Sequence, residues 1–246
     1  MANNVATYGL LGKTLGHSFS KAFFTKLFLQ NNISAVYENF ELENTNLIPA
    51  LLRQDIKGLS VTIPYKEAII PFLDDLSVEA KEIGAVNCVV FKDGNKTGHN
   101  TDAYGFHQSI KPFLTNKHER AMIIGTGGAS KAVAYVLKSI GIDCIFISRN
   151  PSGEKYFPYE AMNEHMLRAC KLVVNCTPIG MFPHINECIN FPFEHLTEEH
   201  LVVDLIYNPE KTLFLQKSEL HGAQILNGES MLKQQALKAW KLWNEK

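Results

Sequence analysis

Hydrophobic positions along the chain follow two alternating patterns, short strand-like runs and longer runs with helical spacing. Strand-like runs occupy 7–11, 35–40, 58–63, 86–91, 121–124 and 143–148. Helix-like runs occupy 21–30, 47–53, 67–73, 78–83, 102–114, the stretch from a glycine loop to about 140, and 229–243. The ranges 159–169, 172–175, 201–205, 212–221 and 224–226 continue the alternation. Such a succession of strands and helices predicts an α/β fold.

Turn and loop signals divide this pattern. The pair Asp93-Gly94 predicts a β-hairpin. The polar stretch 115–120 interrupts the helical spacing, and we place a domain boundary between residues 102 and 118. Residues 182–200 form a long polar and aromatic segment with two prolines, which we interpret as a mobile flap over a cleft.

The composition is that of a globular protein with balanced charge. Hydrophobic residues make up 46% and charged residues 20% of the 246 residues, which excludes a disordered chain, a collagen-like repeat and a small disulfide-rich scaffold. Lys and Arg total 24 against 25 Asp and Glu, so there is no basic excess to hold a phosphate backbone. We therefore expect no nucleic-acid partner.

The sequence also gives no signal for a membrane or for secretion. The longest apolar run, 68–73, contains a proline and is too short to span a bilayer. The opening MANNVATYGLLG lacks the basic and then apolar layout of a signal peptide. No Cys-x-x-Cys pair occurs, and the cysteines that lie in apolar or strand-like stretches, as small buried hydrophobes do, are Cys88, Cys144, Cys170 and Cys176. These features predict a cytoplasmic protein without a membrane partner.

A strand, a glycine turn and a helix follow one another in MIIGTGGASKAV, residues 122–133. This order is typical of the first βα turn of a dinucleotide-binding fold, in which Gly125 permits the tight turn and Gly127 the approach of a pyrophosphate. The free N–H groups at the start of the helix would bind that anion. Ser130 stands where a third glycine is usual, and a tight turn without a ligand stays the alternative.

The end of the next strand indicates which dinucleotide is bound. Folds that prefer NAD place an acidic residue there to bind the ribose 2′-hydroxyl. Here the strand ends in Ser148-Arg149-Asn150, and Lys155 follows shortly after. A guanidinium suits a 2′-phosphate, so the sequence predicts NADP, with a solvated loop arginine as the alternative. A dinucleotide half-site without a metal motif implies hydride transfer.

One segment rich in histidine and glutamate could be interpreted as a metal-binding site. His195 and His200 flank Glu198 and Glu199, but this spacing matches no common metal site. We interpret the segment as a solvated loop and predict no metal.

The first half carries polar residues where a surface strand or turn does not need them. Each has a structural interpretation: Ser18 or Ser20 as a helix cap, Lys66 as a loop cation, Asn87 as a turn residue and Asp102 as a capping carboxylate. The two serine hydroxyls also suit contact with a polyol. Each position alone favours the structural interpretation, whereas together they form a family pattern.

Eight ordered segments resemble shikimate dehydrogenase: GHSFS, SVTIPYK, GAVNCVV, HNTDAYG, IIGTGGASKAV, NCTPIGM, DLIYNP and GESMLKQQA. As an ordered set that runs from about Tyr8 to the last helix, they are very specific. The resemblance implies two α/β domains with a cleft between them: a substrate domain of residues 1–102 with 228–246, and an inserted Rossmann-like NADP-binding domain of residues 103–227. It also implies the reversible NADPH-dependent reduction of 3-dehydroshikimate to shikimate, a step of aromatic amino-acid biosynthesis through chorismate.

The resemblance assigns roles to individual residues. Lys66 and Asp102 match the catalytic pair. The positions matched to substrate contacts are Ser18, Ser20, Ser60, Thr62, Asn87, Gln235 and Tyr207. The positions matched to cofactor contacts are Gly125, Gly127, Gly128, Ala129, Ser148, Arg149, Lys155, Thr177, Leu205 and Gly228. The expected ligands are NADP and a small ring with hydroxyl groups and a carboxylate, which Ser, Thr, Asn and Gln side chains can bind.

The chain departs from the family pattern at several positions. Ser60 replaces the usual Asn and lacks its amide donor. His17 and the short linker near Asn116 also differ, and Ser148-Arg149-Asn150 replaces the usual Asn-Arg-Thr. We expect one substrate contact to change at Ser60.

Two alternative functions stay open. The first is a quinate/shikimate dehydrogenase that uses NAD, which an acidic residue in place of Arg149 would favour. The second is a non-catalytic nucleotide-binding sensor on the same fold, which loss of Lys66 or Asp102 would favour. The oligomeric state, monomer or homodimer, is left open.

Overall fold

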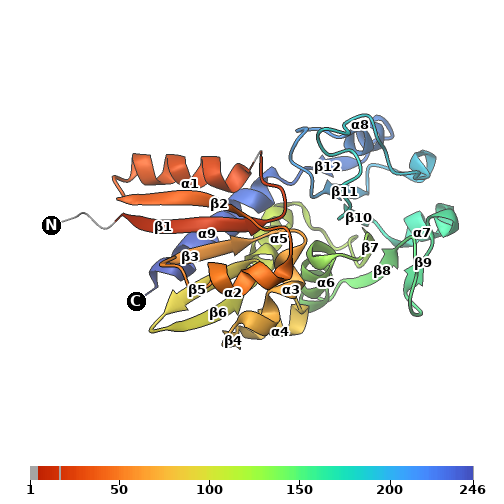
Figure 1. Ribbon diagram of the computed structural model, residues 1–246. Helices are drawn as coiled ribbons and strands as arrows, with labels where there is room; N and C mark the ends of the chain where they lie inside the picture. The colour runs from red at the N-terminus through yellow and green to blue at the C-terminus, as the bar shows by residue number, and fades with distance from the viewer. Residues whose placement is uncertain (1–4, 17, 246) are drawn as a thin grey trace. The chain divides into compact units, whose positions relative to one another are not determined.

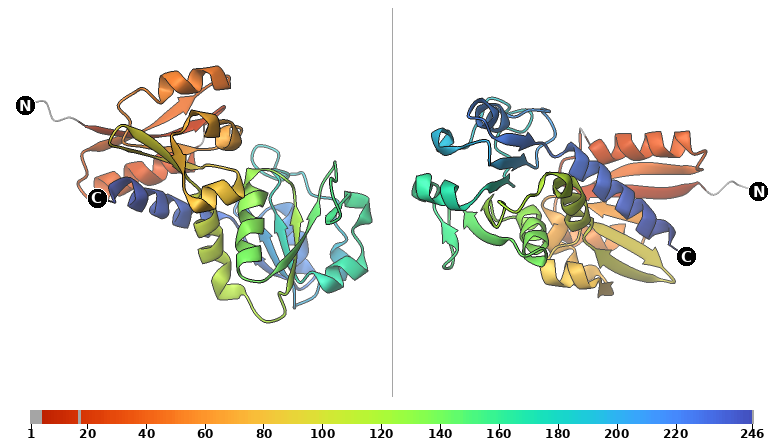
Figure 2. Two further views of the ribbon diagram at one scale, coloured as in Figure 1. Left: turned by 90° about the horizontal axis from the view of Figure 1, so that it is seen from below. Right: turned by 180° about the vertical axis from the view of Figure 1, so that it is seen from behind.

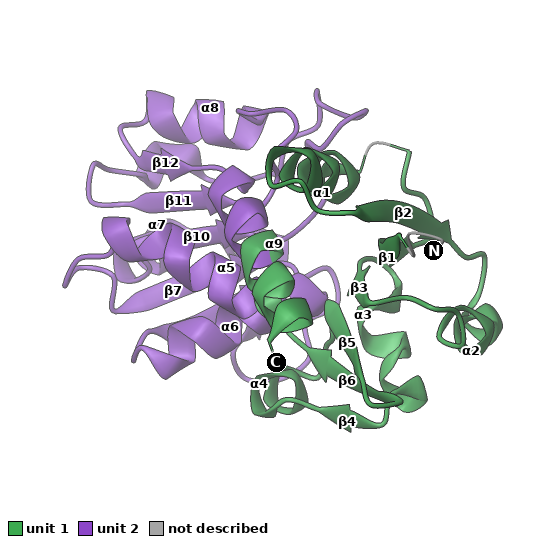
Figure 3. Cartoon of the chain, turned by 90° about the vertical axis from the view of Figure 1, so that its left-hand side faces the viewer, with its two compact units in different colours: residues 1–101, 236–246 green, residues 102–235 purple. Residues whose placement is uncertain are grey.

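The computed structural model describes residues 5–16 and 18–245 (Figure 1). The chain divides into two compact units: unit 1 comprises Met1–Thr101 and Ala236–Lys246, and unit 2 comprises Asp102–Gln235 (Figure 3). Unit 2 is therefore an insertion in unit 1 along the chain. The expectations for the first four residues and for His17 lie outside the described residues.

Within the described residues, unit 1 is built on a six-stranded mixed sheet in the order β2-β1-β3-β5-β6-β4. Its strands are β1 (Ala6–Gly12), β2 (Ala35–Glu41), β3 (Gly58–Val61), β4 (Asp75–Leu76), β5 (Cys88–Lys92) and β6 (Asn95–His99). Its helices are α1 (Phe19–Gln30), α2 (Ile48–Leu51), α3 (Tyr65–Ala68) and α4 (Val78–Ile83), with the short 3-10 helices η1 (Thr45–Leu47) and η2 (Ile70–Phe72). β1 is parallel to β2 and β3, whereas β5 is antiparallel to β3 and β6, which confirms the hairpin.

The two faces of this sheet bury different cores, because side chains alternate along each strand. On one face, Tyr37 of β2 packs against Phe24 of α1 and Trp243 of α9 (Glu229–Asn244). Figure 2 shows α1 and the C-terminal part of α9 on this same side of the sheet. On the other face, Leu59 and residues from α2 and α3 form a second, aliphatic core.

Trp243 connects the C-terminal helix firmly to the sheet. Its indole N–H donates to the carbonyl oxygen of Val89 at 3.0 Å. Gly58 lies directly beneath it, because a Cβ on Gly58 would overlap the indole ring. The end of α9 is therefore part of the core of unit 1.

Unit 2 is built, within the described residues, on a six-stranded sheet in the order β12-β11-β10-β7-β8-β9, whose pairs are all parallel. Its strands are β7 (Arg120–Ile124), β8 (Asp143–Ile147), β9 (Tyr156–Phe157), β10 (Leu172–Asn175), β11 (Leu201–Asp204) and β12 (Gln224–Leu226). Its helices are α5 (Thr101–Ile110), α6 (Gly128–Ser139), α7 (Glu164–Ala169), α8 (Leu213–Leu220) and the first part of α9, with η3 (Lys111–Phe113), η4 (Tyr159–Ala161) and η5 (Phe193–His195).

The strand order of unit 2 reverses at β7. From β7 the chain proceeds to β8 and β9 on one side, and then returns to β10, β11 and β12 on the other. In open parallel sheets, ligands bind at the carboxyl ends of the strands around such a switch point. Gly125 after β7 and Thr177 after β10 meet here, since a Cβ on Gly125 would lie 3.1 Å from Thr177 Cγ2.

Most expected elements are confirmed, although several helices are shorter than predicted. The ranges 47–53, 67–73 and 102–114 each contain a proline, and each combines a short α-helix with a 3-10 helix. Proline removes a backbone donor and so ends or begins a helix. The strands β4 and β9 were not predicted, because two residues show no periodicity.

The segment 182–200 was expected to be a mobile flap, and for its second half this is wrong. Ile189, Phe191 and Phe193 are buried in the core of unit 2. The rings of Phe191 and Phe214 meet edge to face at a centroid distance of 5.3 Å. Burial of these apolar side chains anchors the segment to the unit.

The cysteines behave largely as small hydrophobes. Cys88, Cys144 and Cys170 are buried, as expected, and Cys176 is partly buried. Burial raises the pKa of the Cys144 thiol to about 12 and that of Cys170 to about 11. These thiols therefore stay protonated and unreactive near neutral pH.

Candidate functional site

Most candidate residues of unit 1 lie at one edge of its sheet. Because β5 is antiparallel to β3 and β6, the end of β3, the start of β5 and the end of β6 meet there. Ser60 is in register with Cys88, and Cys88 with His99. The candidates at or next to these strand ends are Ser60, Thr62, Lys66 and Asn87.

Asn87 ties this edge to the start of α5. Its Oδ1 accepts from the Thr101 N–H at 2.6 Å, and its Nδ2 donates to Thr101 Oγ1 at 3.0 Å. Nearby, Asn100 Nδ2 donates to the carbonyl oxygen of Ala85 at 2.9 Å. The two amides fix the junction at which α5 begins. Asp102, the next residue of that helix and the first of unit 2, is buried.

Lys66 is the second residue of α3, whose N-cap residue is Pro64. The Lys66 carbonyl accepts from the Val86 N–H at 2.7 Å. This bond fastens α3 to the segment that leads into β5. The lysine is half-buried.

The three candidate serines of unit 1 have different neighbours. Ser18 caps α1, because its Oγ accepts from the Lys21 N–H at 3.2 Å, which confirms the capping interpretation for this serine. Ser60 is buried, and its Oγ accepts from the Tyr37 hydroxyl at 2.9 Å. Ser20 also hydrogen-bonds to Tyr37, whose pKa is raised by burial. Sequence reasoning missed Tyr37; the only signal was a tyrosine at a core-facing position of β2.

The glycine loop of unit 2 leaves backbone groups open at the start of α6. Gly125 has φ +106°, a value that favours glycine, and its N–H donates to Ile147 O at 2.9 Å. Gly127 is the N-cap residue and has no side chain to satisfy the first N–H groups of the helix. A Cβ there would meet no described atom within 4 Å. The loop therefore offers open N–H groups to an anion.

Ser130 explains why the loop does without a third glycine. Gly128 and Ala129 form the first positions of α6, and Ser130 follows as a buried residue. Its Oγ donates to the carbonyl oxygen of Gly127 at 2.6 Å. The serine turns back onto its own helix start, so the space beside Gly127 stays open.

The end of β8 carries two of the candidates for cofactor choice. Ser148 is buried, and its Oγ accepts from the Asn150 N–H at 3.2 Å, which shapes the turn. Arg149 is exposed and follows the carboxyl end of β8, the strand next to β7. Arg149 thus lies at the same edge of the sheet as the glycine loop.

Lys155, which was also expected to bind the cofactor, has a partner of its own in this structure. The Lys155 ammonium forms an ion pair with Asp143. Asp143 is the first residue of β8, whereas Arg149 follows the opposite end of that strand. The chain from Asn150 onward returns along β8, and the Lys155 carbonyl oxygen accepts from the Phe146 N–H at 2.8 Å.

A buried carboxylate at the end of β11, Asp204, was not predicted. It accepts from Asn175 Nδ2 at 3.0 Å and from Thr212 Oγ1 at 2.6 Å. Asn175 accepts in turn from the Thr177 N–H at 2.9 Å. Burial raises the pKa of Asp204 to about 6. These bonds hold Thr177 beside the glycine loop; the polar residues in NCTPIGM and DLIYNP were the available signal.

Leu205 and Gly228, both expected near the cofactor, lie in contact. A Cβ on Gly228 would overlap the Leu205 carbonyl group, and the Gly228 N–H donates to Ile206 O at 3.0 Å. Only glycine fits this approach. Tyr207 follows in the same loop and is half-buried.

Gln235 is buried near the point where α9 passes α5. A Cβ on Gly105 of α5 would lie 2.6 Å from the carbonyl oxygen of Met231 and 3.0 Å from Gln235 Cβ. The glycine therefore lets the two helices approach closely.

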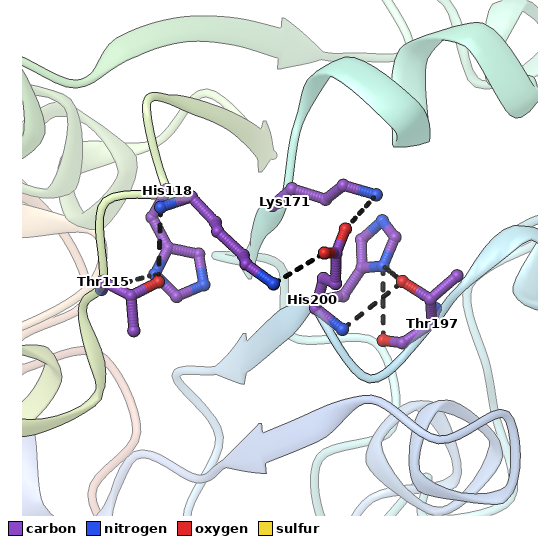
Figure 4. A network of polar contacts seen from close by, with 7 residues as sticks. Thr115, His118, Lys171, Thr197 and His200 are labelled. Carbon is purple, nitrogen blue, oxygen red and sulfur yellow. Dashed lines mark hydrogen bonds and ion pairs between the residues drawn. The ribbon is translucent and has the colours of Figure 1, made fainter.

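The segment around His200 is a buried turn, so its interpretation as a solvated loop is wrong for this residue. The Thr197 N–H donates to His200 Nδ1 at 3.0 Å (Figure 4). His200 Nε2 donates to Leu167 O at 2.9 Å. His118 forms the same turn with the Thr115 N–H, also at 3.0 Å. Burial lowers the pKa of both imidazoles. His200 therefore uses both ring nitrogens for backbone groups.

Two features are absent from residues 5–16 and 18–245. In this part of the chain, no group of three or more His, Cys, Asp or Glu side chains is arranged to hold a metal ion. None of its helices has both the length and the apolar character needed to cross a bilayer.

Comparison with known proteins gives consistent matches. The family pattern described as "Shikimate dehydrogenase substrate binding domain" matches residues 10–89. The protein named "Shikimate dehydrogenase (NADP(+))" from Desulforamulus reducens is 35% identical over 259 residues, covering 96% of this chain and 88% of the relative. The same name is given to a relative from Aquifex aeolicus that is 36% identical over 96% of this chain and 90% of its own length.

Solved structures share the fold over nearly the whole chain. Shikimate 5-dehydrogenase from Thermus thermophilus, in complex with NADP(H) and shikimate, matches with a TM-score of 0.85 and 30% identity over 97% of this chain and 93% of its own. Quinate dehydrogenase from Corynebacterium glutamicum, in complex with NAD, matches with a TM-score of 0.86 and 30% identity over 97% and 93%. The expected fold, an α/β substrate domain plus a Rossmann-like domain, is confirmed. With relatives this similar over almost its full length, the chain belongs to the shikimate dehydrogenase family.

Proposed function

We propose that unit 1 binds the ring substrate and unit 2 binds NADP in the reaction of this family, the reversible NADPH-dependent reduction of 3-dehydroshikimate to shikimate. The observation that carries this assignment is the parallel sheet of unit 2, whose switch point lies beside the open loop at Gly127. Unit 1 presents hydroxyl and amide side chains instead. We place the domain limits at 1–102 with 228–246 and at 103–227, which assigns all of α9 to the substrate domain although its first turns cluster with unit 2.

The residues of unit 2 fit NADP. The open N–H groups at the start of α6 suit the pyrophosphate, and Arg149 suits the 2′-phosphate because no carboxylate occupies its place. Bound NADPH supplies the hydride for the C3 carbonyl carbon. The other proposed cofactor contacts are Gly125, Gly128, Ala129, Ser148, Thr177, Leu205 and Gly228.

The residues of unit 1 suit a small hydroxylated ring. Ser18 uses an oxygen lone pair to cap α1 and keeps its own hydrogen for a ligand, and the start of that helix favours a carboxylate. The other proposed substrate contacts are Ser20, Ser60, Thr62, Asn87, Tyr207 and Gln235.

Lys66 and Asp102 are the proposed catalytic pair. Reduction of the ketone gives its oxygen alkoxide character, and a positioned proton donor lowers that barrier. The Lys66 ammonium donates this proton, and the amine takes a proton back when shikimate is oxidised. Asp102 is proposed as the carboxylate that orients the amine of this lysine, as the family resemblance implies.

We further propose a cytoplasmic location and a state of monomer or homodimer. Free cysteines at all five positions support a reducing compartment. Gel filtration with light scattering distinguishes the two oligomeric states.

One assay tests the function. NADP reduction is followed with shikimate, with quinate and without substrate, and the series is repeated with NAD. The expected result is shikimate-dependent reduction with a higher kcat/KM for NADP than for NAD. Turnover confined to quinate and NAD would support the alternative dehydrogenase, whose fold the Corynebacterium structure shares. No turnover with any pair would support the sensor.

A further inference from the structure

Three hydroxyl groups of unit 1 form a hydrogen-bonded chain, of which two members are buried and the third is partly buried. The Tyr37 phenol donates to Ser60 Oγ at 2.9 Å, and Ser20 forms a second hydrogen bond with the same phenol. The three residues come from α1, β2 and β3. Tyr37 is 2% exposed and Ser60 is 7% exposed. The chain therefore links two proposed substrate contacts through a residue that has no assigned role.

Packing explains the ring of Tyr37 but not its hydroxyl group. The ring stacks on Phe24 at a centroid distance of 4.6 Å and an interplanar angle of 12°, and it lies 6.5 Å from the Trp243 ring. A phenylalanine ring would make the same contacts. Burying a phenol costs free energy unless its hydroxyl is hydrogen-bonded. The hydroxyl therefore has to be understood through its two serine partners.

The number of hydroxyl hydrogens determines whether Ser60 acts as a hydrogen-bond donor or acceptor toward each neighbour. Tyrosine has one hydroxyl hydrogen, and Tyr37 gives it to Ser60 Oγ. Ser60 is then an acceptor toward Tyr37, and its own hydrogen is left for another acceptor. Among the described residues, the Ser60 side chain has no second hydrogen-bond partner. The phenol thus holds this serine as a hydrogen-bond donor at the sheet edge.

We propose that Tyr37 is a positioning residue for substrate selection, which holds Ser60 as a donor so that unit 1 prefers a ring with an oxygen acceptor at that place. The acceptor is a hydroxyl or carboxylate oxygen of the ring substrate. The inference rests on the proposed function, because it requires Ser60 to contact that substrate. Tyr37 itself acts only through the serine.

The test is Tyr37→Phe, which keeps the ring and removes the hydroxyl. We expect KM for shikimate to rise about fivefold, the equivalent of one neutral hydrogen bond, while kcat and KM for NADP change less than about twofold. The matched control is Tyr8→Phe. Tyr8 packs in the same aromatic core, 5.3 Å from the Trp243 ring, and within the described residues it has no hydrogen bond to either serine.

A double variant separates positioning from packing. Ser60→Ala should raise KM for shikimate by a similar factor, and adding Tyr37→Phe to it should change KM by less than about 1.5-fold. Melting temperatures of all variants are measured in parallel, so that loss of folding is recognised.

The outcomes are distinct. An unchanged KM in Tyr37→Phe, an effect that persists undiminished in the Ser60→Ala background, or an equal effect in Tyr8→Phe would each overturn the inference while leaving the proposed function intact. If the unmodified chain does not reduce NADP with shikimate, the proposed function fails and the inference fails with it.

Discussion

Unit 1 and unit 2 present their candidate residues in different ways. Unit 2 relies on backbone groups: the open N–H groups after Gly127 and the close approach of Gly228 to the Leu205 carbonyl. Unit 1 relies on side chains at the edge of a mixed sheet, such as Ser60 and Asn87. The two units therefore differ in which substitutions they tolerate without loss of ligand binding.

The difference shows in how each unit accommodates an unusual serine. In unit 1, Ser60 stands where the family pattern has Asn, and the Tyr37 phenol supplies it with a partner. In unit 2, Ser130 stands where a glycine is usual, and its hydroxyl donates a hydrogen bond to the Gly127 carbonyl oxygen. Gly125 has no such substitute, because its φ of +106° strains any residue with a Cβ.

Lys66→Ala, a substitution in unit 1, should have the largest effect on activity. We expect kcat to fall by roughly two to four orders of magnitude, the range for a general acid–base group, with a smaller change in KM. Steady-state kinetics in both directions measure this. Lys57→Ala is the matched control, since Lys57 is an exposed lysine of unit 1 that pairs with Asp55. Near-normal kcat in Lys66→Ala would remove Lys66 from the mechanism.

Gly127→Ala tests whether unit 2 binds the cofactor through the backbone N–H groups of its glycine loop. Its φ of −81° and ψ of −176° suit alanine, and a Cβ meets no described atom within 4 Å, so folding should be preserved. The methyl group should obstruct the anion, and KM for NADP should rise about thirtyfold, which corresponds to losing one or two charge-assisted hydrogen bonds. KM for shikimate and the melting temperature serve as internal controls. A normal KM for NADP would place the pyrophosphate elsewhere.

Arg149→Asp tests cofactor choice within the same unit. A charge-assisted contact to a phosphate contributes about 1.5–3 kcal/mol, so the preference for NADP over NAD in kcat/KM should fall about tenfold or more. Activity at saturating cofactor should remain. Lys155→Ala is the control and should leave the ratio unchanged, because Lys155 pairs with Asp143 at the other end of β8. An unchanged ratio in Arg149→Asp would mean that the 2′-phosphate is held elsewhere.

Asp204→Asn should have the smallest effect on activity. It should clearly change how the free energy of unfolding depends on pH. The pKa of Asp204 is raised from 3.8 to about 6 in the folded chain. Between these values the folded state binds a proton that the unfolded state does not, so stability falls as pH rises from about 4 to about 6, by up to about 1.4 kcal/mol per pH unit. The variant lacks this contribution. Denaturant unfolding of both proteins across this range measures the difference.

The contribution of the two buried histidines has the opposite sign. Because the pKa values of His118 and His200 are lowered, their contribution to stability is present above pH 6.5 and is lost as pH falls. The wild type and Asp204→Asn both contain these histidines, so the histidine contributions to stability cancel when the two proteins are compared. Parallel pH profiles for wild type and Asp204→Asn would contradict the assignment to Asp204.

The sequence predicted what depends on local pattern. Hydrophobic periodicity located the main strands, and the glycine spacing located the loop at Gly125. It failed where a partner distant in sequence decides the outcome. The ion pair of Lys155 with Asp143 depends on how the chain returns along β8, and the burial of Asp204 and His200 depends on neighbours from other strands and helices. Tyr37 was missed for the same reason, because Ser60 is brought to it by the sheet.

The position of Trp243 has a consequence for synthesis on the ribosome. Its ring lies over Gly58 and its N–H bonds to Val89, so the aromatic core of unit 1 needs residues that are translated only after all of unit 2. Unit 2 is one continuous stretch and has all its core residues available earlier. The first hundred residues therefore emerge with one face of their sheet covered only in part, by α1, and they depend on the nascent chain staying unaggregated until α9 arrives.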